Sequence, residues 1–217
     1  MQNFIKVGTR PSLLALAQVE IIKNLVPELD FEIAPIDTKG DKDKTRPLSL
    51  EEDTDFFTYE IEKALLNKEI DIAIHSAKDL EKNRLSELVI AYMTRPPDRR
   101  DSLVSSRDLK LDELPSNSVI GASSKNRKAS ILKYRDDLIV KDIRGNIDER
   151  LSQLDRGDFD AVIIAYIAMI RLDIKERVAQ VIPFNIIQPH PLQGRIAVQV
   201  HKDNYDLIEL FRGIDEE

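Results

Sequence analysis

The stretch KVGTRPSLLALAQVEII, residues 6–22, decides the fold, because its pattern returns later in the chain. An apolar run leads through Gly8 into a turn with hydroxyl and arginine side chains, and apolar residues at helical spacing follow. The stretch VIGASSKNRKASILKY, residues 119–134, has the same order. Each copy predicts a strand, a turn and a helix. The hydroxyls and an arginine lie at the helix N-terminus, where unpaired N–H groups and the helix dipole attract anions.

A serine at a helix start is usually only a cap, so one such turn would be a weak signal. Two turns in equivalent places predict two α/β lobes that face each other across a cleft. Proline-containing stretches at 94–102 and 188–195 are predicted to cross between the lobes. We therefore expect one lobe from residues 1–94 and 195–217, and the other from residues 95–194.

Short apolar runs alternate with segments of helical period along both halves of the chain. Predicted strands cover 4–9, 31–36, 71–76, 88–93, 118–123, 138–143 and 161–166, and predicted helices cover 12–25, 58–69, a segment ending near Tyr134, and 147–155. This alternation is typical of an α/β fold with mixed, mostly parallel sheets, which bind ligands at the carboxyl ends of their strands.

Composition excludes several classes of function. The net charge of −7 and the pI of about 5.2 disfavour nucleic-acid binding, which depends on clustered positive charge. No apolar run approaches the roughly 18 residues that a membrane span needs, and we expect no secretory signal. The chain has no cysteine and 3 histidines, so we expect no thiolate or zinc site and a cytoplasmic location.

The stretch DIAIHSAKDL, residues 71–80, ends an apolar strand with several polar side chains. One interpretation is an ordinary strand-to-loop transition, in which Asp79 caps a turn or pairs with Lys78. The other is that the strand delivers Asp79 to the mouth of a cleft. His75 is predicted to face the lobe interior as a hydrogen-bonded structural histidine.

Seven motifs together decide between these interpretations. They are GTRPSLLALAQ, TKGD, DIAIHSAKDL, DRRDSLVS, GASSKNRKASIL, IRGNIDERLSQLDRGDFDAVIIA and PLQGRIAVQV. In this order and spacing the chain resembles the hydroxymethylbilane synthase family, also called porphobilinogen deaminase, over its whole length. The resemblance implies a cytoplasmic transferase of tetrapyrrole (heme) biosynthesis that joins porphobilinogen units with loss of ammonia. It also implies a fold like type II periplasmic binding proteins, followed by a small third domain whose cysteine holds a dipyrromethane cofactor.

The resemblance also assigns roles to residues. Asp79 is expected to be the catalytic carboxylate that contacts pyrrole nitrogens, and Asp41 to belong to the active-site loop. The expected binding residues for substrate and cofactor carboxylates are Arg10, Ser12, Lys78, Ser123, Ser124, Arg127, Arg144, Arg150 and Gln193. These residue types suit the chemistry: porphobilinogen carries acetate and propionate arms, which arginine forks bind. Loss of ammonia leaves a cationic azafulvene, which a nearby carboxylate stabilises. For Arg150, a solvated helix face is an equal alternative, and Arg171 matches the family but could be structural.

Three departures from the family pattern qualify this assignment. We expect the third domain to be absent from this chain, and with no cysteine a covalent link to dipyrromethane is impossible. The segment LSLEEDTDFF, residues 48–57, has Leu50 and Thr54 where the family usually has lysines. It also has 4 carboxylates at 51–55, which would repel an anionic product. Ala122 and Asn126 stand where a threonine and an arginine are usual.

One function and two alternatives to it therefore remain open. The first is an enzyme of the family that holds its primer without a covalent bond, or takes the cofactor domain from a separate chain. The alternative is a non-catalytic two-lobed module that binds a small anionic, pyrrole-type ligand, or a degenerate paralogue. In each case we expect no nucleic-acid or membrane partner.

Overall fold

The computed structural model describes residues 4–43, 56–80 and 85–214. The acidic part of the predicted loop, residues 48–55, lies outside the described residues. Contacts divide the described chain into two compact units. Unit 1 contains 4–43, 56–80, 85–96 and 192–214, and unit 2 contains 97–191. The chain passes between the units after residues 96 and 191, whereas the sequence predicts these passages after residues 94 and 194.

Unit 1 is built on a five-stranded sheet with the order β2-β1-β3-β10-β4. Its strands are β1 (Phe4–Thr9), β2 (Asp30–Pro35), β3 (Ile72–Ser76), β4 (Leu88–Met93) and β10 (Ile196–His201). Its helices are α1 (Leu13–Lys23), α2 (Lys39–Lys42), α3 (Tyr59–Leu66) and α7 (Tyr205–Arg212), with a 3-10 helix η2 (Ala77–Asp79). Because β10 pairs antiparallel with both neighbours while the pairs of β1 are parallel, four strands run one way and β10 runs against them.

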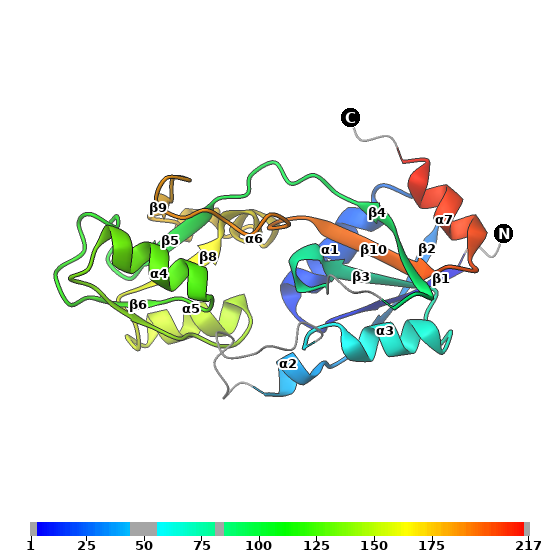
Figure 1. The fold of residues 1–217 in the computed structure, drawn as a ribbon, viewed down its shortest axis with the longest axis horizontal. Helices are drawn as coiled ribbons and strands as arrows, with labels where there is room; N and C mark the ends of the chain where they lie inside the picture. The colour runs from blue at the N-terminus through cyan, green and yellow to red at the C-terminus, as the bar shows by residue number, and fades with distance from the viewer. Residues whose placement is uncertain (1–3, 44–55, 81–84, 215–217) are drawn as a thin grey trace. The chain divides into compact units, whose positions relative to one another are not determined.

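Helices cover both faces of the unit 1 sheet (Figure 1). Residues of α1 and α7, such as Ile22 and Phe211, pack with Ile74 of β3 in one apolar cluster. Residues of α3, such as Leu65, pack with Ala73 of β3 in another. Successive residues of a strand point to opposite faces, so Ile74 faces α1 and α7 while Ala73 and His75 share the face of α3.

Unit 2 is built on a second five-stranded sheet, with the order β7-β6-β8-β5-β9. Its strands are β5 (Asp101–Ser105), β6 (Val119–Gly121), β7 (Ile139–Lys141), β8 (Ala161–Ala165) and β9 (Gln180–Val181). Its helices are α4 (Lys125–Tyr134), α5 (Ile147–Asp155) and α6 (Tyr166–Arg171), with a 3-10 helix η3 (Lys175–Arg177).

The two sheets share one topology. In each, the first strand of the repeated sequence pattern, β1 or β6, pairs parallel with both neighbours. The fourth strand in each sheet order, β10 or β5, is antiparallel to both of its neighbours. It is also the first strand after the chain crosses into that unit from the other one. The predicted α/β class with mixed, mostly parallel sheets is confirmed. No helix among the described residues is long and apolar enough to cross a bilayer.

Most predicted elements are found with small shifts in their ends. β1, β4 and α5 have the predicted limits. The strands β5, β9 and β10 and the helices α2, α6 and α7 were not predicted, and β5 begins inside the stretch 94–102 that was interpreted as a crossover. The three strands pair with segments far away in the sequence, which local periodicity does not reveal.

The close packing of Ile70, in the segment between α3 and β3, against β1 depends on Gly8. A Cβ atom at this position would lie 2.2 Å from Cδ1 of Ile70 and 3.4 Å from Cγ2 of Ile61. We predict that Gly8→Ala lowers the free energy of unfolding by about 1–3 kcal/mol through overpacking. Adding Ile70→Val, which removes the clashing atom, should recover part of that loss in urea unfolding.

Gly213 provides the matched control, because a Cβ there meets only backbone oxygens at 3.4 and 3.5 Å. Gly213→Ala should change stability much less than Gly8→Ala. Equal effects of the two substitutions would contradict the proposed packing constraint.

Candidate active site

A small polar hollow of about 30 Å³ lies at the carboxyl ends of β1 and β3 in unit 1. Its polar lining residues are Thr9, Arg10, Ser12, Gln18, Thr58, His75, Ser76 and Asp79, and its apolar ones include Phe57 and Ile74. Two segments far apart in the sequence, the β1–α1 turn and the end of β3, therefore meet around one space. Its volume suits one or two water-sized groups rather than a whole pyrrole ring.

The β1–α1 turn presents Arg10 and Ser12 to this hollow. Ser12 is the N-cap of α1, and its Oγ accepts a hydrogen bond from the N–H of Ala15 at 3.3 Å. Arg10 stands two residues earlier, between the end of β1 and the start of α1. The predicted grouping of a hydroxyl and an arginine at a helix N-terminus is thus present in unit 1.

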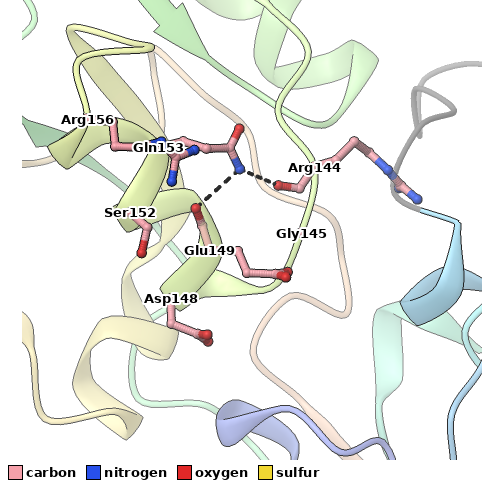
Figure 2. Close-up of a pocket in the computed structure, with 7 residues that line it drawn as sticks. All are labelled: Arg144, Gly145, Asp148, Glu149, Ser152, Gln153 and Arg156. Atoms are coloured by element: carbon pink, nitrogen blue, oxygen red, sulfur yellow. Dashed lines mark hydrogen bonds between the residues drawn. The ribbon is translucent and has the colours of Figure 1, made fainter.

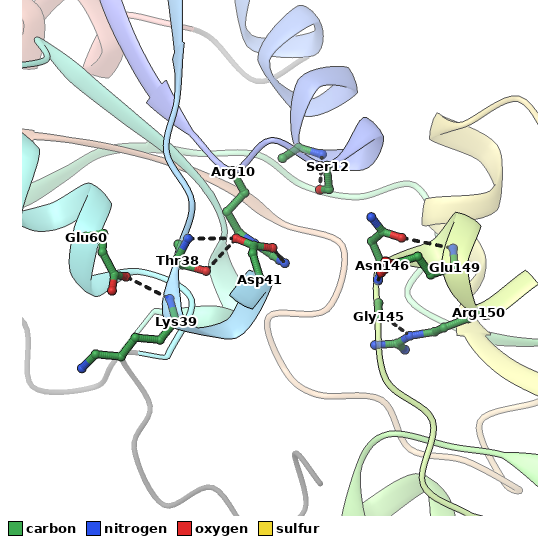
Figure 3. Close-up of polar contacts among 11 residues, drawn as sticks. Arg10, Ser12, Thr38, Lys39, Asp41, Glu60, Gly145, Asn146, Glu149 and Arg150 are labelled. Atoms are coloured by element: carbon green, nitrogen blue, oxygen red, sulfur yellow. Dashed lines mark hydrogen bonds and ion pairs between the residues drawn. The ribbon is translucent and has the colours of Figure 1, made fainter. Parts of the chain in front are cut away.

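Arg10 is held by an internal carboxylate and an aromatic ring. Its Nε donates to both carboxylate oxygens of Asp41 at 3.1 Å, and a terminal nitrogen donates to Oδ1 (Figure 3). Its guanidinium carbon lies 4.3 Å from the centre of the Phe57 ring, which is a cation–π distance. These contacts fix the guanidinium in place, so little side-chain entropy remains to be lost when a ligand binds.

Asp41, expected in the active-site loop, lies in the short helix α2 and is the anchor of this arrangement. Besides Arg10, it accepts hydrogen bonds from the N–H and Oγ1 of Thr38, at 3.1 and 2.7 Å (Figure 3). Burial raises the pKa of Asp41, but the hydrogen bonds and charge of Arg10, with the Thr38 hydrogen bonds, outweigh it and hold that pKa below its usual value.

Asp79 ends the 3-10 helix η2, three residues beyond β3. The start of η2 is fixed by the N–H of Ala77, which donates to the carbonyl of Arg195 at 2.9 Å. Asp79 is half-buried and lines the same hollow as Arg10 and Ser12. Lys78, its neighbour, is exposed. The end of the strand thus delivers an acid to a polar hollow, while the catalytic role of Asp79 stays a prediction.

His75 faces the interior, as predicted, and is 4% exposed. Burial lowers the pKa of His75 to about 4, the charge of Arg10 acts in the same direction, and the polar side chain of Gln199 opposes both. The expected hydrogen bond is not formed at good geometry, because Nε2 is buried without a partner among the described residues. Its neighbour Ser76 exchanges hydrogen bonds with Gln18 of α1, at 3.0 and 3.3 Å.

The corresponding turn of unit 2 has a different arrangement. Ser124 is the N-cap of α4, and its Oγ accepts from the N–H of Arg127 at 3.2 Å. Arg127 is buried at 7% exposure and donates to the carboxylate of Asp101, which is 1% exposed. The carboxylate that Arg127 binds in this structure is therefore an internal one. Its expected role toward a ligand stays a prediction.

Arg150 of α5 contacts both the turn that precedes α5, at Gly145, and the turn that precedes α4, at Ser123. Its Nε donates to the carbonyl of Gly145 at 2.8 Å (Figure 3). A terminal nitrogen donates to Oγ of Ser123 at 3.0 Å. Gly145 has φ +95°, a conformation that favours glycine. Arg150 therefore makes ordered contacts and does not simply lie on a solvated helix face.

Arg144 borders a second, larger hollow of about 450 Å³ along α5, lined also by Gly145, Asp148, Glu149, Ser152, Gln153 and Arg156. The carbonyl of Arg144 accepts a hydrogen bond from the Gln153 side chain at 3.0 Å, and the Arg144 side chain extends away from α5 (Figure 2). Gln193, the last expected binding residue, is buried in unit 1.

Sequence reasoning missed several residues around these sites. They are Phe57 against Arg10, Asp101 against Arg127, and the buried pair Glu62 and Gln199. The one sequence feature that could have indicated such residues is an ionisable residue in or beside an apolar run, as at Asp101 before an apolar stretch.

Comparison with known proteins decides the family. The model of the family described as "Porphobilinogen deaminase, dipyromethane cofactor binding domain" matches residues 5–209. The chain is 42% identical to the porphobilinogen deaminase of Pelotomaculum thermopropionicum over 99% of its own length and 70% of that protein. It is 42% identical to the Deinococcus radiodurans enzyme over 98% of its length and 71% of that protein. The chain belongs to the porphobilinogen deaminase family.

Solved structures of lower identity show the fold. The chain is similar to a Bacillus subtilis lipoprotein, with a TM-score of 0.57 and 13% identity over all of this chain and 92% of that one. It is also similar to the periplasmic VFT2 domain of Bordetella pertussis BvgS, with a TM-score of 0.53 and 17% identity over 97% of this chain and 86% of that one. The predicted fold, like that of type II periplasmic binding proteins, is confirmed.

The family cofactor, dipyrromethane, fits these 217 residues only in part. Hydroxyl and arginine donors at the two turns suit its carboxylates. A covalent thioether needs a thiol, and these residues contain none.

The lowered pKa of Asp41 predicts how acid affects this porphobilinogen deaminase family member. Because the ionised form is favoured in the folded state, its stabilising effect is present above the unfolded pKa of about 3.9 and is lost as pH falls through the folded pKa. Urea unfolding between about pH 6 and about pH 2 should show a smaller loss of stability for Asp41→Asn than for the wild type. Identical pH dependence in the two proteins would contradict the assignment.

The buried ion pair of Arg127 and Asp101 predicts that removing one partner destabilises the protein more than replacing both. Asp101→Ala leaves the Arg127 charge buried without its main partner, and should lower the free energy of unfolding by about 3–5 kcal/mol. Replacing both residues, as Asp101→Leu with Arg127→Met, should be less destabilising than the single change. If Asp101→Ala lowers the free energy of unfolding less than the double replacement does, the ion pair is not the dominant interaction of these residues.

Proposed function

We propose that this chain binds porphobilinogen and releases ammonia from it, with Asp79 as the carboxylate that stabilises the cationic intermediate. The observation that supports this most directly is that Asp79 lines the same hollow as Arg10 and Ser12 in unit 1. An acid and anion-binding donors are thus held within one small space. The family assignment supplies the substrate class.

The proposed reaction passes through a cation that a carboxylate can stabilise. When the aminomethyl carbon–nitrogen bond of porphobilinogen breaks, its electron pair leaves with ammonia, and the pyrrole nitrogen lone pair stabilises the azafulvene cation that remains. The α-carbon of a second pyrrole then attacks the methylene carbon, and the new bond becomes stable when that α-carbon loses its proton. Asp79, as a carboxylate, lowers the energy of the cation.

Positioning is assigned to the basic and hydroxyl side chains. In unit 1, Arg10 and Ser12 are proposed to hold an acetate or propionate arm, with Lys78 at the exposed side and Gln193 as a further contact. In unit 2, the same role is proposed for Ser123, Ser124, Arg127, Arg144 and Arg150. Since Arg127 is paired with Asp101, we expect that carboxylate to reduce the positive charge that Arg127 contributes to a ligand.

A cytoplasmic location and a pyrrole primer complete the proposal. These 217 residues have no thiol, so they would hold that primer by hydrogen bonds and charge, and a covalent attachment would need residues outside them, for example on an added cofactor-domain chain. Adding such a chain is therefore one arm of the test.

Ammonia release from porphobilinogen tests the proposal directly. Asp79→Asn keeps the size of the side chain but removes its charge, and we predict that it lowers kcat for ammonia release by about 10²–10³-fold. KM should change much less, because the carboxylate acts mainly on the developing cation. Bound pyrrole is measured in parallel with an aldehyde reagent.

Asp206→Asn, an exposed position on α7, is the matched control and should have wild-type activity. Tight binding of porphobilinogen without ammonia, with or without a separate cofactor domain, would contradict the proposed activity and favour the binding module. Ammonia release unaffected by Asp79→Asn would contradict the role of that residue.

A further inference from the structure

The turn that precedes α5, residues 144–146, is bound through its backbone by side chains of that helix. Oε2 of Glu149 accepts a hydrogen bond from the N–H of Asn146 at 2.9 Å, and Oδ1 of Asn146 accepts from the N–H of Glu149 at 3.1 Å. The Arg150 Nε donates to the carbonyl of Gly145 at 2.8 Å (Figure 3). The reciprocal pair of Asn146 and Glu149 is a capping box, which by itself indicates only a stable helix start.

Gln153 adds a contact that a capping box does not contain. Its side-chain nitrogen donates to the carbonyl of Arg144 at 3.0 Å and to the carbonyl of Glu149 at 3.2 Å (Figure 2). Gln153 thus connects the residue before Gly145 to the first turn of α5. Each of the three residues of the turn is therefore bound through a backbone atom by a different side chain of α5.

Gly145 makes this close contact possible and also makes the turn easy to deform. It has φ +95°, and a Cβ atom there would lie 2.7 Å from Oε2 and 2.9 Å from Cβ of Glu149. Only glycine therefore lets the turn approach α5 so closely. Glycine also has the most flexible backbone of all residues, so the chain could rotate directly after Arg144. The hydrogen bonds to Arg144 and Asn146, on either side of the glycine, restrict that rotation.

The turn carries the side chain of Arg144, which is half-buried and extends away from α5 (Figure 2). Gln153 binds the carbonyl of Arg144, so it fixes the backbone from which this side chain starts. The guanidinium lies at the end of a long side chain, and a rotation of the backbone at Gly145 would displace it. The position of the guanidinium therefore depends on contacts that the guanidinium itself does not make.

We propose that Gln153 and Glu149 are positioning residues, which hold the turn 144–146 so that the Arg144 guanidinium is already placed to bind a carboxylate arm of the substrate. This inference rests on the proposed function, because it takes Arg144 as a binding residue for porphobilinogen. A side chain that is held in its binding position loses less conformational freedom when the ligand binds. Gln153 and Glu149 thus increase affinity without touching the ligand.

The effect of Gln153 on binding is tested with two substitutions of similar length. Gln153→Met removes the donor, and calorimetric affinity for porphobilinogen should fall about 3–10-fold. Gln153→Lys keeps a donor and should bind within about twofold of the wild type. In ammonia release, Gln153→Met should raise KM and change kcat less than about twofold, because a contact to a remote carboxylate is the same in the ground state and in the transition state.

A double-mutant cycle shows whether Gln153 acts through Arg144. In an Arg144→Met background, Gln153→Met should change affinity less than about twofold, because no guanidinium remains to be positioned. An equal loss of affinity in both backgrounds would show that Gln153 only stabilises unit 2, and would overturn the inference. Asp155→Asn, which alters a surface ion pair of the same helix with Arg177, is the control and should bind as the wild type does.

The role of Glu149 can be tested without any ligand. Glu149→Gln keeps a side-chain oxygen that can accept from the N–H of Asn146, whereas Glu149→Leu does not. Amide hydrogen exchange at Asn146, measured by NMR, should be faster in Glu149→Leu than in the wild type and little changed in Glu149→Gln. Exchange as slow in Glu149→Leu as in the wild type would overturn the role of Glu149 in holding the turn.

The outcomes separate this inference from the proposed function. If the wild-type protein and Gln153→Met, folded by circular dichroism, bind porphobilinogen equally well, the role of Gln153 is overturned and the proposed function stands. Wild-type protein that does not bind porphobilinogen would instead overturn the proposed function, and with it the ligand assigned to Arg144. A loss of affinity in Gln153→Met that Gln153→Lys restores, and that disappears in the Arg144→Met background, supports the inference.

Discussion

The pairing of β10 with β3 is the interaction on which the rest of unit 1 depends. β10 comes from near the C-terminal end of the described chain and completes the sheet between β3 and β4. The carbonyl of Arg195, just before β10, fixes the start of η2 and hence the place where Asp79 emerges. The same strand brings Gln199 beside His75. One long-range pairing thus sets both the acid of the hollow and the buried polar side chains behind it.

Two arginine–carboxylate pairs show how each unit prepares its anion-binding turn. Arg10 is exposed in part and paired with Asp41, while Arg127 is almost fully buried with Asp101. A pair near the surface orients a guanidinium and leaves its outer face accessible. In a buried pair, the attraction between the two charges mainly offsets the free-energy cost of removing them from water, and the pair contributes mainly to a specific packing. The two turns have similar sequences but different electrostatic properties, because their partners differ in burial.

Much of the local structure could be predicted because it depends on neighbours in the chain. The limits of β1 and α5 follow from apolar periodicity and from caps such as Asn146. The contacts that define the site could not be predicted in this way. Gln199 and Glu62 are 137 positions apart, and Asp101 and Arg127 are 26 apart. Nothing in a local pattern states which polar residues will face each other inside a folded sheet.

The sequence by itself determined the family, the α/β class and the grouping of hydroxyls and arginines at two helix starts, since motif order and periodicity are properties of the chain alone. Only the tertiary structure decided that Asp79 shares a hollow with Arg10, that Arg127 is internal and that His75 is buried against Gln199. The physical reason is that burial removes water as a partner. Each polar group must then find an internal partner, and the sheet topology, rather than the residue itself, selects which partner is within reach.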